Sequence, residues 1–281
     1  MLGISKQPSH IPTFTINANQ TDLRLTLHQN ITRSIAIRLN AKTTNMIFTK
    51  LLETISSLER PNGEVWFRGQ SDASWILTPR LLRSPNGVAQ EQNILARFRT
   101  RAMGMLPSHP ADNDPARWMF LMQHHGVPTR LLDWTESALV ALYFAVSGSP
   151  DCDGAFYMLL PMDLNESQIA KPILFSPYSE EIHKMLMASF KGSDISVAVF
   201  AMLAYASNDR ISRQRGNFTI HGSSTDLRTF NNSPWLTTLK IPAASKPEIR
   251  EQLAYFGVTQ ASLFNDLDSL ASELREQHGI N

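Results

Sequence analysis

The chain has 281 residues, of which 42% are hydrophobic and 18% charged, and its net charge at pH 7 is +1. This length and apolar content provide for a sizeable core, in one large domain or two small ones. The nearly balanced charge argues against strong nonspecific attraction to nucleic acid, although it leaves room for a local basic patch. The one cysteine, Cys152, excludes an intramolecular disulfide and fits a reducing cytosol.

The sequence predicts a cytoplasmic protein that does not bind a membrane. Its longest apolar stretch, around residues 195–206, is too short to span a bilayer. The first residues, MLGISKQPSHIPTF, lack the basic start and the continuous apolar run of a signal peptide.

In chain order, an amphipathic helix is the first well-defined element. Residues 1–43 are polar and predict an N-terminal extension or accessory strands. Apolar residues at helical spacing predict a helix over residues 44–58, and the Pro-Asn-Gly turn at residues 61–63 ends it. Residues 64–70, EVWFRGQ, are typical of a strand in which Gly69 lets the backbone approach another group closely.

Three further helices are expected before the middle of the chain. Residues 90–103 predict a helix with several basic side chains on one side, and Asp114 is a good N-cap for the next helix. A turn over residues 132–135 is expected to lead into a short apolar helix over residues 136–146, with Thr135 as its N-cap.

The second half of the chain mixes strands and helices. We expect strands within residues 154–161, 211–222 and 235–242. Helices are expected over residues 178–206, with an interruption near Gly192, and over residues 246–255 and 261–277. Because strands and helices do not alternate regularly, the sequence favours an α+β fold over a doubly wound sheet. No linker rich in Pro, Gly or Ser divides residues 44–281, so these residues are expected to form one domain.

The stretch from residue 123 to residue 146 is the most informative for function. Polar side chains are dense in its first half and directly precede an apolar helix, which is how pockets are commonly built. The turn at residues 126–128 separates the two halves. The polar candidates are His124, His125, Thr129, Arg130, Asp133, Trp134 and Thr135.

Several candidates also have a purely structural interpretation. Arg68, at the end of an apolar run, offers a planar fork of donors for phosphate or carboxylate, but it could equally form an internal salt bridge. Arg130 and Asp133 are spaced to lock their loop as an ion pair. Gln214 could be a buried amide that satisfies backbone groups at a sheet edge.

Familiar catalytic and metal-binding motifs are absent from the sequence. There is no phosphate loop, no helical His-Glu-x-x-His and no Gly-x-Ser-x-Gly elbow. His124 and His125 are adjacent, and neighbouring helical side chains point about 100° apart, so they would not hold one metal ion. We therefore expect no metal site.

Five segments, taken in order, carry a resemblance to a known family. WFRGQ and TPRLLR are followed by QHHGVPTRLLDWTESALVALYFAV, by RISRQRGNFTI and by residues 239–270. Together they resemble the FRG domain family, named for a Phe-Arg-Gly that stands here at residues 67–69. The third segment is similar to that family's Gln-His-x-Gly-x-Pro-Thr-Arg-Leu-Leu-Asp-Trp-Thr signature. The resemblance covers about residues 44–275 and implies an FRG-like domain over residues 44–281.

The order of elements also resembles, more weakly, an ADP-ribosyltransferase fold. This resemblance implies two small, mostly antiparallel sheets that form a cleft for NAD and are surrounded by helices. It implies that Arg68 binds phosphate or ribose oxygens, that Thr135 keeps Arg68 in position, and that Gln214 accepts a hydrogen bond from the ribose 2′-hydroxyl. Asp133 and Asp209 are the candidates for the carboxylate that such enzymes carry where this chain has Gln214.

The same resemblance implies a set of site residues. The catalytic residues would be Arg68, Thr135, Gln214 and Asp133. The residues that bind NAD would be Arg68, Gly69, Gln70, His125, Thr129, Arg130, Trp134 and Tyr143. Trp134 or Tyr143 would stack on the nicotinamide ring.

Three hypotheses of function follow. The first is an NAD-dependent ADP-ribosyltransferase that modifies RNA, DNA or protein as a bacterial toxin or phage-defence effector. The second is a noncatalytic module that binds a nucleotide or nucleic acid through the basic residues Arg97, Arg99, Arg101, Arg213 and Arg215. The third is a nuclease or other hydrolase that uses His124 or His125 with Asp133. For a toxin we also expect a neutralising partner, which the C-terminal helix at residues 260–276 could bind through an apolar patch.

Overall fold

The structure is a computed structural model that describes residues 47–59, 63–191, 198–204 and 214–280. The predictions for residues 1–43, Asp209 and Arg213 lie outside these described residues.

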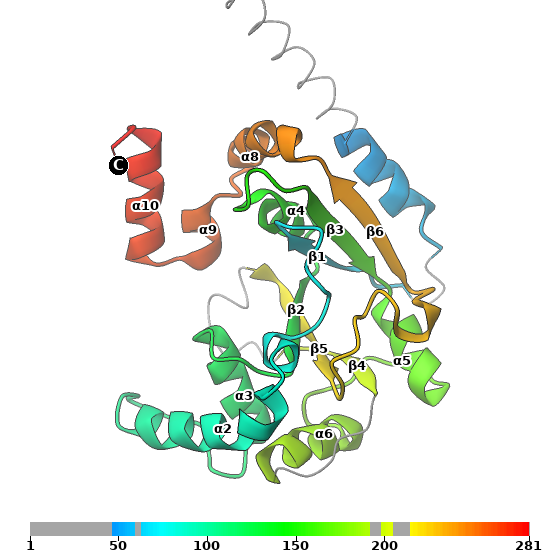
Figure 1. Cartoon of the computed structure of the whole chain (residues 1–281), viewed down its shortest axis with the longest axis vertical. Helices are drawn as coiled ribbons and strands as arrows, with labels where there is room; N and C mark the ends of the chain where they lie inside the picture. The colour runs from blue at the N-terminus through cyan, green and yellow to red at the C-terminus, as the bar shows by residue number, and fades with distance from the viewer. Residues whose placement is uncertain (1–46, 60–62, 192–197, 205–213, 281) are drawn as a thin grey trace, which may run out of the picture. The chain divides into compact units, whose positions relative to one another are not determined.

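Within the described part of the chain, six strands form one sheet in the order β4-β5-β2-β1-β3-β6 (Figure 1). The strands are β1 (Trp66–Gln70), β2 (Leu131–Thr135), β3 (Gly154–Leu159), β4 (Val199–Met202), β5 (Gly216–His221) and β6 (Leu236–Ile241). Each pair of neighbouring strands runs antiparallel. With helices packed around this sheet, the predicted α+β class is confirmed.

The sheet consists of two three-stranded halves that meet at a narrow junction. β1 and β2 pair at one position, where Phe67 lies opposite Thr135. By contrast, β1 pairs with β3 over five positions, and β2 pairs with β5 over five positions. The two sheets implied by the transferase resemblance are therefore joined into a single sheet, because this one pair connects the halves.

Helices pack on the sheet and around its ends. The α-helices are α2 (Gly87–Met103), α3 (Pro115–His124), α4 (Ala138–Val146), α5 (Pro161–Ile169), α6 (Glu180–Lys191), α8 (Lys246–Tyr255), α9 (Gln260–Phe264) and α10 (Leu267–Gln277). A further helix occupies residues 47–57. Short 3₁₀ helices are η1 (Arg80–Arg83), η2 (Phe230–Asn232) and η3 (Ala243–Ser245). In the described residues, no helix is both long and apolar enough to cross a membrane.

The start of α3 follows from local chemistry, as the sequence predicts. The Asp114 carboxylate accepts a hydrogen bond from the Arg117 backbone N–H at 3.0 Å, and Pro115 occupies the first turn. Pro is well suited to this position because its missing N–H would have no partner there. Gly126, with φ of +71°, follows the end of the helix.

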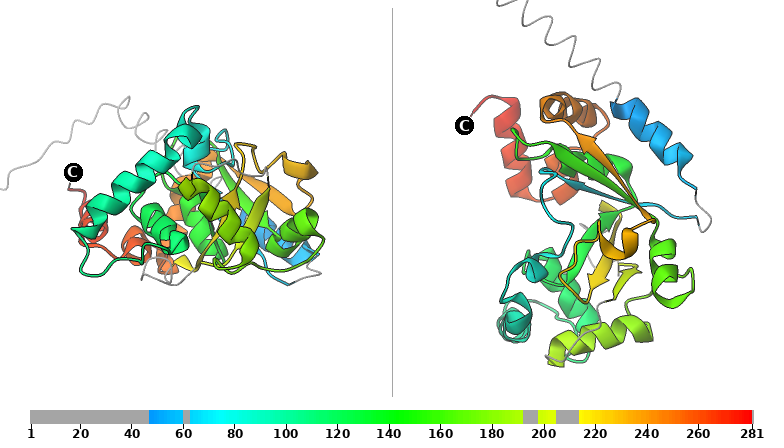
Figure 2. Two further views of the ribbon diagram at one scale, coloured as in Figure 1. Left: turned by 90° about the horizontal axis from the view of Figure 1, so that it is seen from below. Right: turned by 45° about the vertical axis from the view of Figure 1, so that its right-hand side comes forward.

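Three apolar clusters hold the two halves of the sheet in place. One packs Phe67, Phe156 and Met158 against α4 and α8, and another lies on the opposite face around Trp66. The third joins α3 and α6 to β4 and β5. Figure 2 shows α2, α3 and α6 gathered beside β4 and β5, while α4 and α8 lie with β3 and β6.

Gly69 lets α4 lie directly on β1. A Cβ atom at Gly69 would come within 1.9 Å of the Ala141 carbonyl oxygen, and one at Gly154 of β3 would come within 2.3 Å of the Ala145 carbonyl oxygen. The close backbone approach predicted at Gly69 is confirmed, and the group it approaches is a helix of the same chain.

Residues 131–135 form strand β2 rather than the predicted turn. β5 pairs with β2 along its whole length, from Leu131 opposite Ile220 to Thr135 opposite Gly216. The N-cap of α4 is consequently Ser137 and not Thr135: the Ser137 hydroxyl accepts a hydrogen bond from the backbone N–H of the third residue of the helix at 3.4 Å.

Two other predicted helices are wrong in part. Residues 199–202, expected to be helical, form the buried strand β4, because a short apolar run fits a buried strand as well as a helix. The expected helix over residues 261–277 is divided into α9 and α10. Asn265 ends α9 in the left-handed conformation, with φ of +53°, and Asp266 caps α10.

Candidate functional site

Three segments that are distant in the sequence line one pocket of about 220 Å³. β1 contributes Arg68, β2 ends there with Thr135, and Gln214 lies two residues before β5. The pocket adjoins the narrow junction of the two sheet halves, because both members of the Phe67–Thr135 pair line it. The remaining lining residues are Gly69, Gln123, Asp133, Trp134, Val140, Ala141 and Phe144.

Two of the larger cavities, with volumes of about 510 and 350 Å³, lie elsewhere in the described residues. The first is lined by Trp235 and by exposed or half-buried acidic side chains, and the second lies against α8 and α10. Neither contains a guanidinium with a buried nitrogen that lacks a partner. The 220 Å³ pocket does contain such a guanidinium, that of Arg68, and we take this pocket as the candidate site.

Arg68 is held at the point where the two halves of the sheet separate. Beyond the Phe67–Thr135 pair there is no ladder between β1 and β2, and Arg68 Nη1 instead donates to the Asp133 carbonyl oxygen at 2.6 Å. The Arg68 side chain is 18% exposed, and its Nε is buried with no hydrogen-bond partner in the described structure. Burial lowers the pKa of the Arg68 guanidinium, and the nearby Asp133 partly offsets this effect.

The Asp133 carboxylate is oriented by a chain of hydrogen bonds. The Thr129 hydroxyl donates to the Gln123 amide oxygen at 2.5 Å, and Gln123 Nε2 donates to Asp133 Oδ2 at 2.8 Å. The carboxylate lies 3.9 Å from Arg68 Nη1 and remains 59% exposed. The salt bridge considered for Arg68 thus exists as a loose pair, and the Asp133 carboxylate is still accessible from the pocket.

Gln123 is one of the pocket residues that were not predicted from the sequence. It lines the pocket and links Thr129 to Asp133. A signal for it was present, because Gln123 is the first residue of the central motif that resembles the family signature.

Thr135 and Gln214 are joined to each other rather than to Arg68. The Thr135 hydroxyl donates to the Gln214 carbonyl oxygen at 2.5 Å and accepts from the Ser137 N–H at 3.0 Å. The Gln214 side-chain amide donates to the Leu263 carbonyl oxygen at 3.3 Å, a bond that does not use its amide oxygen. The expected contact of Thr135 with Arg68 is therefore corrected: Thr135 fixes the backbone on which Gln214 stands.

A comparison with protein families bears on this geometry. Residues 63–153 match the FRG domain. The chain contains an FRG domain. The matched segment carries Arg68, Gln123, Asp133 and Thr135, whereas Gln214 lies beyond its end. Neither a curated protein nor a solved structure gives a significant match to the chain.

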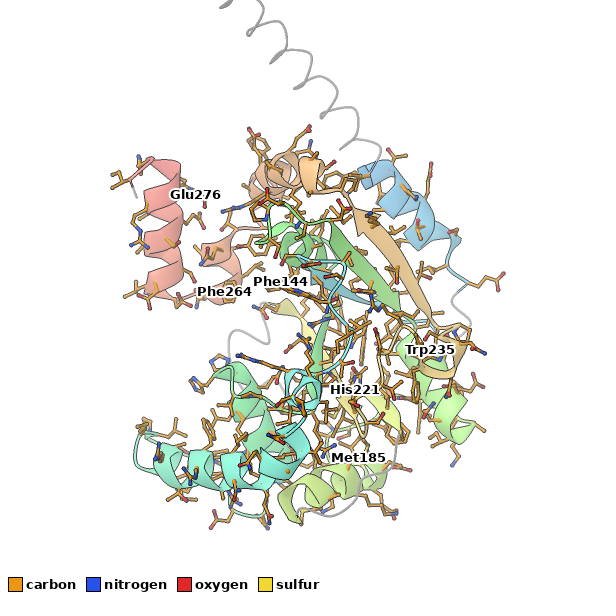
Figure 3. The ribbon with its side chains drawn as sticks, in the orientation of Figure 1. Phe144, Met185, His221, Trp235, Phe264 and Glu276 are labelled. Carbon is orange, nitrogen blue, oxygen red and sulfur yellow. The ribbon has the colours of Figure 1, made fainter. Side chains whose placement is uncertain are left out.

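The aromatic wall of the candidate pocket comes from Phe144 and not from Tyr143. Tyr143 is buried, and it lines the separate cavity against α8. Phe144 is half-buried and lies four residues, about one helical turn, after Val140, so both face the pocket. Figure 3 shows Phe144 beside Phe264, and their rings meet edge to face with centroids 6.1 Å apart.

Trp134 lines the pocket, but its side chain belongs to the core. It is 2% exposed, and its indole N–H donates to the Thr219 hydroxyl at 3.0 Å. Stacking of its ring on a nicotinamide does not agree with this burial.

Arg130 is a structural residue of the FRG domain and does not reach the pocket. Its guanidinium and the Glu91 carboxylate form a buried ion pair, with Nε 2.7 Å from both carboxylate oxygens and Nη2 2.6 Å from Oε2. Arg130 Nη1 also donates to the His221 carbonyl oxygen at 3.3 Å. The suggested pairing of Arg130 with Asp133 is thus corrected, because a partner 39 residues away in the sequence takes its place.

Three other residues expected to bind NAD also lie outside the pocket lining. Gln70 is buried and its amide oxygen accepts from the Tyr157 hydroxyl at 3.0 Å. Thr129 is buried and acts through Gln123, and His125 is exposed beyond the end of α3. Gly69 does line the pocket, but the same glycine is needed for the contact with α4.

Proposed function

We propose that this protein is an NAD-dependent ADP-ribosyltransferase that modifies a macromolecule. The proposal rests on the convergence of Arg68, Asp133, Thr135 and Gln214 around one pocket with an aromatic wall. A cation, a carboxylate and an amide oxygen beside apolar surface form a combination suited to a charged dinucleotide whose glycosidic bond is to be broken.

The pocket would take the nicotinamide–ribose half of NAD. Its volume of about 220 Å³ is below the ~300–1,000 Å³ of typical small-molecule sites, so it fits a part of the dinucleotide. The nicotinamide ring would lie against Phe144, and Arg68 would bind ribose or phosphate oxygens. The Gln214 amide oxygen would accept a hydrogen bond from a ribose hydroxyl.

Asp133 would supply the negative charge that Gln214 lacks. When the bond between ribose C1′ and nicotinamide breaks, nicotinamide leaves with the bonding electron pair and positive charge develops on the ribose. The Asp133 carboxylate, oriented by Gln123, would stabilise this charge. A nucleophilic group of the acceptor would then bond to C1′ and lose its proton, for which Asp133 would be the acceptor.

The experiment is to incubate the protein with NAD that carries a label on its adenine-ribose part and with RNA, DNA or protein acceptors. Nicotinamide release and transfer of label are the two readouts. We expect Asp133→Asn to lower the rate of nicotinamide release about 100-fold or more, because a preorganised charge at the reacting centre is removed. Urea unfolding should show unchanged stability, since Asp133 is exposed and is paired with Arg68 only loosely.

A matched control is Asp151→Asn, which removes the same charge from an exposed position outside the pocket lining. Its rate should equal that of the unmodified protein. Absence of both nicotinamide release and label transfer with all three acceptor classes would overturn the proposed activity, as would an equal loss in the two variants.

The second hypothesis, a noncatalytic binding module, loses part of its basis in the structure. Arg99 pairs with Asp112 at 2.9 Å, and Arg215 pairs with Glu136 at 3.0 Å. Arg97 and Arg101 remain exposed on α2. The arginines that motivated a basic surface are therefore partly neutralised by acidic neighbours.

A role as a bacterial toxin or phage-defence effector, with a neutralising partner, belongs to the same proposal. The surface that supports it is on α10, where Leu267, Leu270 and Leu274 are exposed. Growth arrest on expression of the unmodified chain, relieved by Asp133→Asn, is the expected cellular result.

A further inference from the structure

A second cavity, of about 270 Å³, shares a wall with the candidate pocket. Arg68, Gln123 and Asp133 line both cavities. Two further arginines, Arg80 and Arg83, line the second cavity alone. Its other lining residues are Gly126, Val127, Pro128, Leu131 and Leu132.

The local structure of η1 directs both arginines to this cavity. In a 3₁₀ helix, residues three apart lie on the same face, so Arg80 and Arg83 are aligned while Leu81 and Leu82 point into the core. Arg83 Nε donates to the Thr78 carbonyl oxygen at 2.7 Å, which fixes the guanidinium and leaves its two terminal nitrogens out of that bond.

The positive charge around this cavity is not balanced by its lining. Three guanidiniums face one carboxylate, that of Asp133, which already accepts a hydrogen bond from Gln123. Burial and the proximity of Arg80 both lower the pKa of Arg83, and Arg83 in turn lowers the pKa of Arg68. Like charges gathered in this way are stabilised when an anion binds between them.

We propose that the cavity lined by Arg68, Arg80 and Arg83 is a binding site for a phosphate group. Guanidiniums offer paired N–H donors that match phosphate oxygens, and three of them suit a doubly charged phosphate or pyrophosphate. The phosphate comes either from a nucleotide in the adjoining pocket or from the backbone of a nucleic-acid acceptor. The site follows from the arginines themselves, so it holds whether or not the protein cleaves NAD.

The test is calorimetric titration of the full chain with inorganic pyrophosphate at low ionic strength. We expect the double variant Arg80→Gln/Arg83→Gln to bind at least about tenfold more weakly, because it removes two guanidiniums that would form charge-assisted hydrogen bonds to phosphate. Affinity should also fall as salt is added. The matched control is Arg97→Gln/Arg101→Gln, which removes the same charge from the exposed face of α2 and should bind normally.

Loss of the Arg83 bond to Thr78 could disturb the fold, so the single variant Arg80→Gln is measured as well. Arg80 is exposed, and its substitution should weaken binding several-fold with an unchanged unfolding curve. Failure of the unmodified protein to bind pyrophosphate at millimolar concentration would overturn the assignment. Equal losses in the α2 control and the double variant would also overturn it.

Competition then identifies the source of the phosphate. Displacement of pyrophosphate by NAD or ADP-ribose supports a nucleotide, and displacement by a single-stranded oligonucleotide but not by NAD supports a nucleic-acid backbone. If neither the nucleotides nor the oligonucleotide displaces pyrophosphate, the proposed site is overturned, because the cavity would then bind an adventitious inorganic ion only. Pyrophosphate binding without any nicotinamide release would overturn the transferase proposal and leave this site standing.

Discussion

Arg68 and Arg130 carry the same guanidinium but have opposite surroundings. Arg130 is 2% exposed, and the Glu91 carboxylate and a backbone carbonyl occupy its nitrogens. Arg68 has one strong bond to a carbonyl oxygen, a loose pair with Asp133 and a buried Nε without a partner. We therefore interpret Arg130 as a structural residue and Arg68 as a residue that binds a ligand.

His221 carries a prediction about pH. It is fully buried in β5, and burial, with a smaller contribution from Arg68, lowers its pKa from 6.5 to about 3. Its side chain, labelled in Figure 3, shares a hydrogen bond of 2.9 Å with Thr219. Between pH 6.5 and about 3 the unfolded chain therefore binds a proton at His221 that the folded chain does not.

It follows that stability falls as pH falls through this window, by up to about 1.4 kcal/mol per pH unit from His221 alone. Urea unfolding of the unmodified protein and of His221→Gln, measured from pH 7 to pH 4.5, checks this. The variant should be less stable at pH 7, but its stability should depend less steeply on pH. Identical slopes of stability against pH in the two proteins would show that His221 binds its proton as readily in the folded chain as in the unfolded chain.

At the scale of elements, the contact between β1 and α4 positions the pocket. Gly69 and Gly154 remove the side chains that would hold α4 away from the sheet. Val140 and Phe144 on α4 then reach the pocket that Arg68 lines from β1. The aromatic wall and the guanidinium thus depend on the same packed interface.

Gly69→Ala tests this interface. Its added methyl group would meet the backbone of α4 at Ala141 and Ala145, which cannot move aside as a flexible side chain can. We expect a loss of about 1–3 kcal/mol or more in the free energy of unfolding, measured with urea. A matched control is Gly126→Ala, where no atom lies within 4 Å of the added methyl group, so that its positive φ of +71° is the one source of strain. A loss no larger than that of the control would contradict the proposed close contact.

At the scale of the whole described domain, the pocket lies where two three-stranded halves meet at a single residue pair. Apolar clusters on both sides support each half, whereas the junction itself has little backbone pairing. The Arg68 bond to the Asp133 carbonyl oxygen spans the gap that the short ladder leaves. A ligand that contacts both Arg68 and β2 would add a further connection between the two halves of the sheet.

Thermal unfolding measures this effect. Ligand at 100 times its dissociation constant stabilises the folded state by about 2.7 kcal/mol, which raises the midpoint of unfolding. With pyrophosphate or NAD we expect this rise in the unmodified protein and in Arg97→Gln, and a smaller rise in Arg68→Gln at the same ligand concentration. An equal rise in all three proteins would mean that the ligand binds elsewhere.

Local chemistry allowed much of the fold to be predicted from the sequence. The Asp114 cap, the Trp66–Gln70 strand and the helix at residues 246–255 depend on neighbouring residues and appear as expected. Residues 199–202 were harder to assign, because a short apolar run does not distinguish a buried strand from a helix. β5 pairs with residues 131–135 from more than 80 positions away, and a contact of that range leaves no local signal.

The sequence by itself determined which residue types line the pocket, since Arg68 and the central motif over residues 123–146 supply most of its lining. Only the tertiary structure decided their partners: Glu91 for Arg130, the Gln214 carbonyl for Thr135, and Phe144 in place of Tyr143 as the aromatic wall. The physical reason is that composition and spacing fix the local conformation of a segment. The side that a residue presents to a pocket depends on which distant strand or helix packs against it.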